Sequence, residues 1–275
     1  MHKVEFVPEH AVPASPVRGR VQLAARFAKW SVTSAKRRWF DFTANALKGE
    51  FQLLSRTLDD LRNDDLVQCN LCGWTGAGFY PNTGAGFHEP RTTCPGCLSQ
   101  DRYRTLLEVL RSQTTMLAGT DRVVEVAPCA EFQELLRTYD IDYASFDLLR
   151  PEAMEQGDIT AMRFADGSVD WFLCYHVLEH IPDDQLALKE IHRVLKPAGT
   201  AVLQVPYDFV NPTREFGFAD PRDVHHVRLY GTDFADIVTA AGFDVRRIEP
   251  ADCFSADDRA RFGFHPDPIY FATKR

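Results

Sequence analysis

The chain has 275 residues, enough for one α/β core and a small additional module, and 45% of its residues are hydrophobic. It holds no stretch of about 18 consecutive apolar residues, so the sequence predicts no membrane-spanning helix. The formal net charge of -8 argues against a general nucleic-acid surface on the main domain, because phosphate neutralisation needs a basic face.

The first 62 residues differ in charge from the rest of the chain. They hold 11 Lys and Arg against 6 Asp and Glu, whereas the remaining residues hold 20 against 33. Residues 1–16 contain three prolines and no long apolar run, and we expect a flexible arm there. Residues 17–66 are expected to form an N-terminal helical segment. Its second half carries a short apolar seam of coiled-coil type, formed by Leu47, Phe51, Leu54, Leu58 and Leu61.

The basic part of this segment has two interpretations. Residues 17–40 carry seven basic and no acidic side chains, together with Trp and Phe, as helices on anionic membrane surfaces do. The other interpretation is a solvated helix that packs on its own protein or on a second subunit, as in a homodimer formed through residues 17–62. The expected location is cytoplasmic, with peripheral contact at the inner membrane face if the first interpretation holds.

Four of the seven cysteines predict a metal site. Two thiolates in each of two tight turns, with Gly73 and Gly96 beside them, suit a tetrahedral ion. Four cysteine ligands leave no open position, so the predicted zinc ion is structural and residues 67–100 form a zinc-ribbon module in a reducing compartment. The alternatives are four reduced thiols, or His88 in place of one ligand. The cysteines form two C-x-x-C pairs separated by 21 residues: Cys69 and Cys72, then Cys94 and Cys97.

Residues 101–275 alternate between strand-like and helix-like patterns, which predicts an α/β domain with a mainly parallel sheet. The clearest unit runs from Asp166 to Pro206 and consists of a strand, a loop, an amphipathic helix, a turn and a second strand. The predicted helices cover 101–110, 132–139, 183–195 and 233–241. The predicted strands cover 122–126, 142–146, 169–174, 200–205, 243–248 and 268–273.

Three short motifs of this unit resemble a known family. Asp166-Gly-Ser-Val-Asp precedes a strand, His176-Val-Leu-Glu-His follows that strand, and Leu195-Lys-Pro-Ala-Gly ends the helix. Together they resemble class I S-adenosylmethionine (SAM) dependent methyltransferases of the type 11-like branch. The resemblance implies a Rossmann-like seven-stranded methyltransferase sheet with helices on both faces, in which strand seven runs antiparallel between strands five and six.

One loop departs from the usual pattern of that family. The loop Ala127-Pro-Cys-Ala-Glu holds no glycine, although backbone must approach the methionine part of SAM closely there. The departure is itself similar to a group of methyltransferase-like proteins that carry an N-terminal C-x-x-C element and a late segment matched here by Phe216-Gly217 and by His226 to Gly231. The resemblance therefore extends from about Cys69 to Arg275.

The resemblance also implies a set of cofactor-binding residues. A carboxylate at the end of the second strand, Asp147, would accept the ribose hydroxyls of SAM; the alternative is a turn or helix-cap aspartate. Glu125 would meet the methionine ammonium or pair with a buried arginine. Asp158 would bind the adenine amino group, with Ile159 against the ring. The implied set is Glu125, Ala127, Pro128, Asp147, Asp158, Ile159 and His176.

The candidates for chemistry are two histidines. His176 follows the fourth strand, in the crevice where open α/β sheets hold ligands, and a histidine near neutrality suits removal of an acceptor proton. His226 lies in the long segment between Phe209 and Gly231, which we interpret as an acceptor lid. An arginine there suits a carboxylate or phosphate, or forms a structural ion pair. The expected substrate-binding residues are Tyr207, His225, His226 and Arg228.

Three functions remain open from the sequence. The leading one is methyl transfer from SAM to an oxygen or nitrogen of a small-molecule acceptor, or of a lipid- or glycan-linked one. The second is an rRNA or tRNA methyltransferase that uses the zinc module for RNA. The acidic main domain argues against it, as does Cys174–Val177 in place of the Asn/Asp-Pro-Pro-aromatic motif. The third is a SAM-fold binding protein without catalysis.

Overall fold

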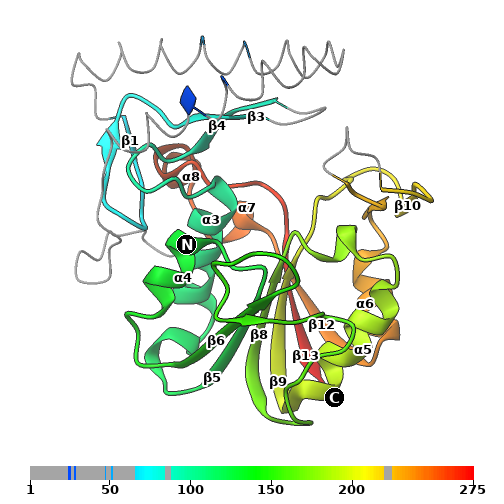
Figure 1. Ribbon diagram of the computed structural model, residues 1–275. Coiled ribbons are helices and arrows are strands. Elements are labelled where there is room, and N and C mark those ends of the chain that lie inside the picture. Colours follow the sequence, from blue (N-terminus) through cyan, green and yellow to red (C-terminus); the bar gives the residue numbers. More distant parts are fainter. Residues whose placement is uncertain are drawn as a thin grey trace. The chain divides into compact units, whose positions relative to one another are not determined.

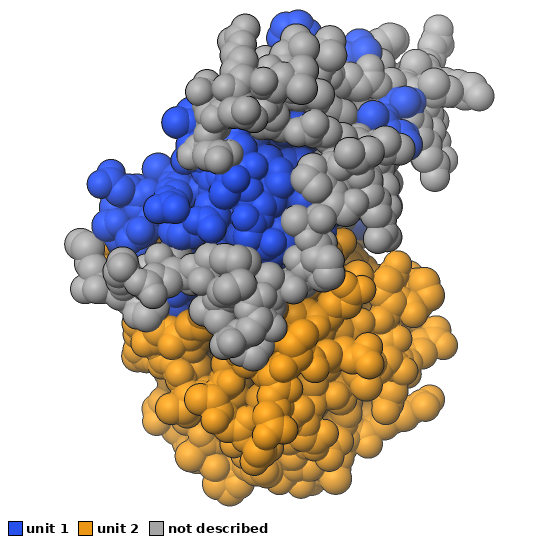
Figure 2. Space-filling view, turned by 90° about the vertical axis from the view of Figure 1, so that its left-hand side faces the viewer, with its two compact units in different colours: residues 1–108, 220–225, 254–265 blue, residues 109–219, 226–253, 266–275 orange. Residues whose placement is uncertain are grey.

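The computed structural model describes residues 66–83, 88–219 and 225–275, and five single positions before them. The predicted arm at 1–16 and nearly all of the predicted helical segment at 17–66 lie outside the described residues. The described chain forms two compact units, coloured separately in Figure 2. Within the described residues, no helix is both long enough and apolar enough to cross a membrane.

Unit 2 comprises residues 109–219, 226–253 and 266–275 and contains a mixed sheet of seven strands (Figure 1). The strands are β5 (Arg122–Val126), β6 (Asp142–Asp147), β7 (Glu155–Gln156), β8 (Val169–Tyr175), β9 (Leu195–Gln204), β12 (Phe243–Ile248) and β13 (Ile269–Lys274). Their spatial order is β12-β13-β9-β8-β5-β6-β7, and β13 runs antiparallel to both of its neighbours. The Rossmann-like methyltransferase sheet is thereby confirmed, with the last strand inserted antiparallel as expected.

Continuous apolar runs explain why the middle strands form the core. Parallel strands covered on both faces need apolar side chains at successive positions, and Phe172, Leu173 and Cys174 of β8 are all buried. Helices α5 (Asp184–Val194) and α6 (Phe234–Ala240) cover one face, and α4 (Ala130–Leu136) covers the other (Figure 1). The sheet edge formed by the carboxyl ends of the parallel strands is left for the intervening loops.

Helix α5 and the turn after it follow the sequence closely. Asp183 caps the helix by accepting a hydrogen bond from the Leu186 amide at 2.9 Å. Strand β9 begins at Leu195 and includes the turn after α5, where the positive φ falls on Ala198. Gly199 is needed for close packing, because an added Cβ would lie 3.0 Å from the Val169 carbonyl oxygen.

Unit 1 comprises the described parts of residues 1–108, 220–225 and 254–265. It contains two antiparallel hairpins, the first part of one helix, and a helix from near the end of the chain that the sequence patterns did not indicate. These elements are β1 (Val67–Gln68), β2 (Thr75–Gly76), β3 (Tyr80–Thr83), β4 (His88–Thr93), α3 (Asp101–Gln113) and α8 (Ala256–Phe262). Helix α3 continues into unit 2, so one helix contributes residues to both units.

The remaining described elements are short. Three single-turn helices are η2 (Met116–Ala118), η3 (Leu178–His180) and α7 (Pro250–Cys253), and β10 (Arg214–Glu215) pairs antiparallel with β11 (Arg228–Leu229). Of these, η3 and β11 carry residues of the candidate site.

Candidate functional site

The four predicted metal-binding cysteines lie together in unit 1. All four are buried, and their sulfur atoms lie within 4.8 Å of one another. The Sγ atoms of Cys69 and Cys97 are 3.9 Å apart, and those of Cys72 and Cys94 are 3.7 Å apart. A tetrahedral zinc ion with Zn–S bonds of about 2.3 Å requires S–S separations of about 3.8 Å. The donor set and its spacing therefore fit a zinc ion.

The two cysteine turns have matching backbone geometry. Residue i+4 donates its amide to the carbonyl of the first cysteine in each turn, from Gly73 to Cys69 at 2.9 Å and from Leu98 to Cys94 at 2.8 Å. Gly73 and Leu98 both have positive φ. Each turn folds its two thiols toward the same point, which is the arrangement needed to hold an ion. Gly96 donates its amide to the Cys94 sulfur at 3.3 Å, as expected for a site built for thiolate charge.

In unit 2, the loop after β5 contains a residue in the left-handed backbone conformation that glycine adopts most easily. Ala127 has a φ of 53°, in the left-handed region, and its amide donates to the Phe146 carbonyl at 2.9 Å. Pro128 follows it, and α4 begins at Ala130. The loop without glycine thus turns at the residue where the family pattern would place one.

Replacing Ala127 by glycine is expected to raise the free energy of unfolding by up to about 1.5 kcal/mol. Relief of left-handed strain is worth about 1–2 kcal/mol, and the added chain entropy of glycine offsets about 0.5–1 kcal/mol. Urea unfolding measures the difference. The matched control is Ala144→Gly in β6, where the backbone is extended and a loss is expected; equal losses in both variants would contradict the strain at Ala127.

Glu125 is buried inside β5 and bonded to a tyrosine. Its side chain is 1% exposed, and the Tyr143 hydroxyl donates to Oε2 at 2.5 Å. Burial raises the pKa of Glu125 to about 8, against the lowering effect of that hydrogen bond. No arginine contributes to this shift, so the described environment does not supply the arginine partner considered from the sequence.

The raised pKa of Glu125 predicts that stability falls as pH rises. The folded state holds a proton on this carboxyl up to about pH 8, whereas the unfolded chain releases it near 4.5. The stabilising contribution is complete below the unfolded pKa and is lost between these two values, by on the order of 5 kcal/mol. Urea unfolding at several pH values should show this slope in the wild type and its reduction in Glu125→Gln. The same slope in both proteins would contradict the assignment.

Asp147 and Asp158 both follow strands at the carboxyl edge of the sheet. Asp147 ends β6, and its Oδ1 accepts hydrogen bonds from the Leu149 and Arg150 amides, both at 2.7 Å. These two hydrogen bonds match the alternative considered from the sequence, in which Asp147 is a turn aspartate. They orient the carboxylate through Oδ1 alone. Asp158 accepts from the Thr160 amide at 2.8 Å.

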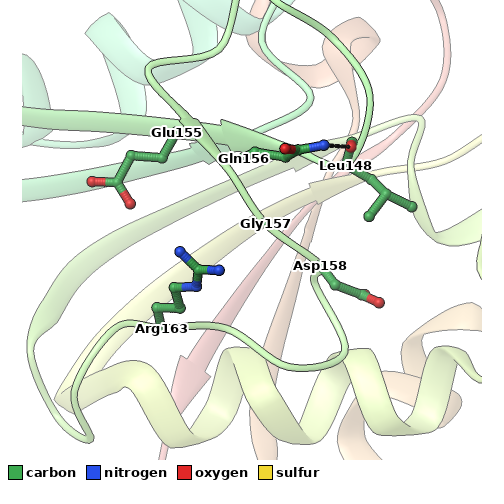
Figure 3. Close-up of a pocket in the computed structure, with 6 residues that line it drawn as sticks. All are labelled: Leu148, Glu155, Gln156, Gly157, Asp158 and Arg163. Carbon is green, nitrogen blue, oxygen red and sulfur yellow. Dashed lines mark hydrogen bonds between the residues drawn. The ribbon is translucent and has the colours of Figure 1, made fainter.

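An open cavity of about 510 Å³ lies beside these strand ends (Figure 3). Glu155 and Arg163 lie on one side of it and Asp158 on the other, while Gln156 donates to the Leu148 carbonyl at 2.9 Å. Ile159, expected against an adenine ring, is 4% exposed and belongs to the hydrophobic core. The cavity is lined by Leu148, Glu155, Gln156, Gly157, Asp158 and Arg163.

Three histidines, two of them in the loop after β8, lie near one carboxylate. Glu179 in η3 has a fully buried side chain, and its Oε1 lies 3.4 Å from His176 Nδ1. The same oxygen lies 3.9 Å from His180 Nε2 and 3.9 Å from His226 Nε2. The rings of His180 and His226 meet edge to face, with centroids 4.7 Å apart. Both predicted catalytic histidines are therefore in this cluster, together with Glu179 and His180, which were not predicted as catalytic.

The other predicted substrate-binding residues have different surroundings. Arg228 is 3% exposed and pairs with Glu215 at 2.7 Å. It also donates to the carbonyl oxygens of Leu178, Ile181 and Pro182. These contacts match the structural alternative and fix the loop that carries Glu179.

Tyr207 is 9% exposed, and its hydroxyl accepts a hydrogen bond from Arg247 at 2.8 Å. His225 is exposed, has a φ of 64°, and belongs to unit 1.

The strand order and the loops at this edge can be compared with known proteins. Residues 109–203 match the family model of a methyltransferase domain. This stretch contains β5 to β8, nearly all of β9 and the His176–His180 loop.

One curated relative is similar over part of the chain. An uncharacterized 37.1 kDa protein in transposon TN4556 of Streptomyces fradiae is 34% identical over 115 residues, which is 39% of this chain. The match spans only 33% of that relative's length.

Two solved structures show similarity at lower identity. A SAM-dependent methyltransferase from Mesorhizobium loti is 15% identical, with a TM-score of 0.44, covering 62% of this chain and 98% of its own. The 1,6-didemethyltoxoflavin-N1-methyltransferase of Burkholderia thailandensis is 17% identical, with a TM-score of 0.43, covering 62% and 83%. Similarity at this level says nothing about the acceptor.

Sequence patterns in unit 2 did not indicate two contacts. Tyr143, the hydrogen-bond donor to Glu125, lies in β6 at a position that reads as an ordinary strand tyrosine. Glu179 was visible inside the His176–His180 motif, but its role depends on His226, which is distant in the chain. A buried carboxylate flanked by histidines at i-3 and i+1 is the local signal that would have indicated it.

Proposed function

We propose that the chain transfers a methyl group from SAM to an oxygen or nitrogen of a small-molecule acceptor, or of a lipid- or glycan-linked one. The observation that carries the proposal is the common sheet edge shared by Glu125, Ala127, Asp147 and His176. Ligands of open α/β sheets bind outside the carboxyl ends of the strands. The family match over residues 109–203 supports the same reaction class.

The proposed cofactor position follows from the chemistry of these residues. Ala127 and Pro128 offer backbone close to the methionine part, whose ammonium would favour the ionised form of Glu125. Asp147 has one carboxylate oxygen committed to the turn, and the proposal assigns the other to the ribose hydroxyls. The open cavity that includes Asp158 supports placing the adenine there.

Zinc at the four cysteines is part of the proposal. Four buried thiols within 4.8 Å of one another support a closed structural site that stabilises unit 1. The ion would act on folding and not on the methyl group, because a four-thiolate site has no open position.

Transfer of labelled methyl groups tests the function and separates the alternatives. The protein is incubated with methyl-labelled SAM and a cell extract divided into small-molecule, lipid and RNA fractions. Label in the small-molecule or lipid fraction, lost in Asp147→Ala, is the expected result. Label in RNA alone would favour the RNA methyltransferase. Binding of SAM without label in any fraction would favour the binding protein without catalysis.

A further inference from the structure

The cluster around Glu179 resembles a metal site more closely than a general-base site. Its carboxylate is fully buried, and the side chains of His226 and His180 are 14% and 34% exposed. A buried carboxylate needs a compensating positive charge, and imidazole and carboxylate are the usual ligands of divalent first-row metal ions. The exposed side of His180 leaves a path to solvent.

The distances agree with a single shared ion. Two ligand atoms that bind one ion at about 2.1 Å cannot be more than about 4.2 Å apart. Glu179 Oε1 lies 3.9 Å from His180 Nε2 and 3.9 Å from His226 Nε2, and the three ligand atoms all lie within 4.8 Å of one another. The remaining pair is formed by the ligand nitrogen atoms of His180 and His226. A small rotation of either imidazole would bring these two atoms within about 4.2 Å of each other.

The backbone holds these ligands in place. The Val227 amide donates to the Glu179 carbonyl at 2.8 Å, which joins the segment of His226 to η3. Arg228, in the same segment, donates to the Leu178 and Ile181 carbonyls on either side of the Glu179–His180 pair. Residues 47 positions apart in the chain are thereby fixed as one ligand set.

We propose that Glu179, His180 and His226 bind a divalent first-row metal ion such as Zn²⁺, and that the methyl acceptor reaches it through a hydroxyl oxygen. Three protein ligands leave an open position, unlike the four cysteines. The ion lies after β8, at the sheet edge where the cofactor is placed; this second part rests on the proposed function.

The ion lowers the pKa of the acceptor hydroxyl, which loses its proton to water. The acceptor oxygen then forms a bond to the methyl carbon while the carbon–sulfur bond breaks. The sulfur keeps the electron pair, so the positively charged sulfonium becomes a neutral thioether. In this proposal His226, which the sequence suggested as the base for the acceptor proton, is instead a ligand of the metal ion.

Cobalt(II) uptake without any cofactor tests the metal site. Labile metal is removed from the intact chain with a chelator, with the metal retained by the cysteines measured by mass spectrometry, and Co²⁺ is then titrated. The expected result is one Co²⁺ per chain with visible absorption but no thiolate-to-cobalt charge-transfer band. His226→Ala and Glu179→Gln should bind Co²⁺ more weakly, by more than the about 10–100-fold that outer-shell changes cost.

The matched control is His192→Gln on α5, whose ring packs against Phe243 and which is not among the proposed ligands. It should bind Co²⁺ like the wild type. Circular dichroism checks that His226→Ala is folded, so that its loss of cobalt reports on the ligand. Wild type that takes up no cobalt outside the cysteines, or folded His226→Ala that binds like the control, would overturn the proposal. Because no SAM is present, either result leaves the test of methyl transfer unaffected.

Discussion

Cys94→Ser is expected to abolish zinc binding at the four-cysteine site and to unfold unit 1. A structural zinc ion contributes about 10–16 kcal/mol of apparent binding free energy at neutral pH, and much of it is folding free energy. The cluster offers no substitute for the lost ligand, because its other three thiols already converge on the same point. Zinc content by mass spectrometry and proteolysis within residues 66–108 measure the two effects.

The control for this variant is Cys253→Ser. Cys253 lies in α7 of unit 2 and is partly exposed, so its replacement removes a thiol without touching the cluster. It should keep the zinc content of the wild type and resist the protease like the wild type. A Cys94→Ser protein with full zinc content and unchanged protease resistance would show that the four thiols do not form the site.

Arg104→Met is expected to lower the free energy of unfolding of unit 1 by about 3–5 kcal/mol. The side chain is fully buried, and its guanidinium lies 3.7 Å from the centroid of the Phe79 ring. Removing it leaves several buried carbonyl groups without their donor, which costs about 1–3 kcal/mol for each group left unsatisfied, with partial relaxation. It donates to the carbonyl oxygens of Phe262 at 2.7 Å, Thr92 at 2.9 Å, Gly263 at 3.0 Å and Ser99 at 3.2 Å.

Urea unfolding monitored by a unit 1 signal, such as Trp74 fluorescence, measures this loss. Arg91→Met is the control, since Arg91 is an exposed residue of β4 in the same unit and should change stability by less than about 0.5 kcal/mol. Equal effects of the two substitutions would mean that the buried guanidinium does not hold the end of α8 in unit 1.

The sheet could be predicted because each of its strands is marked by the pattern of its own residues and needs no knowledge of distant contacts. The strands from 122–126 to 243–248 are short apolar runs separated by helix patterns, and a capping aspartate with a Pro-Gly stop marks α5. The cysteine pairs were predictable for the same reason, since spacing alone determines each metal-binding turn.

What the sequence could not predict depends on contacts between distant residues. The return of α8 to unit 1 depends on Arg104, whose carbonyl partners lie more than 150 residues away as well as nearby. The left-handed φ of Ala127 could not be predicted from its residue type, because alanine normally avoids that backbone conformation. Arg228 reads as an anion-binding residue in the sequence, and only its buried contacts with Glu215 and three carbonyls indicate the structural role.

Calorimetric titration with S-adenosylhomocysteine, the demethylated cofactor, tests most directly whether this sheet edge binds SAM. The wild type should bind one molecule per chain, and Asp147→Ala should bind about 10- to 100-fold more weakly, as expected for loss of a charged hydrogen-bond acceptor. Asp142→Ala is the control, because Asp142 is exposed at the opposite end of the same strand. No heat with the wild type at millimolar ligand, or equal affinities for Asp147→Ala and Asp142→Ala, would contradict the proposed cofactor site.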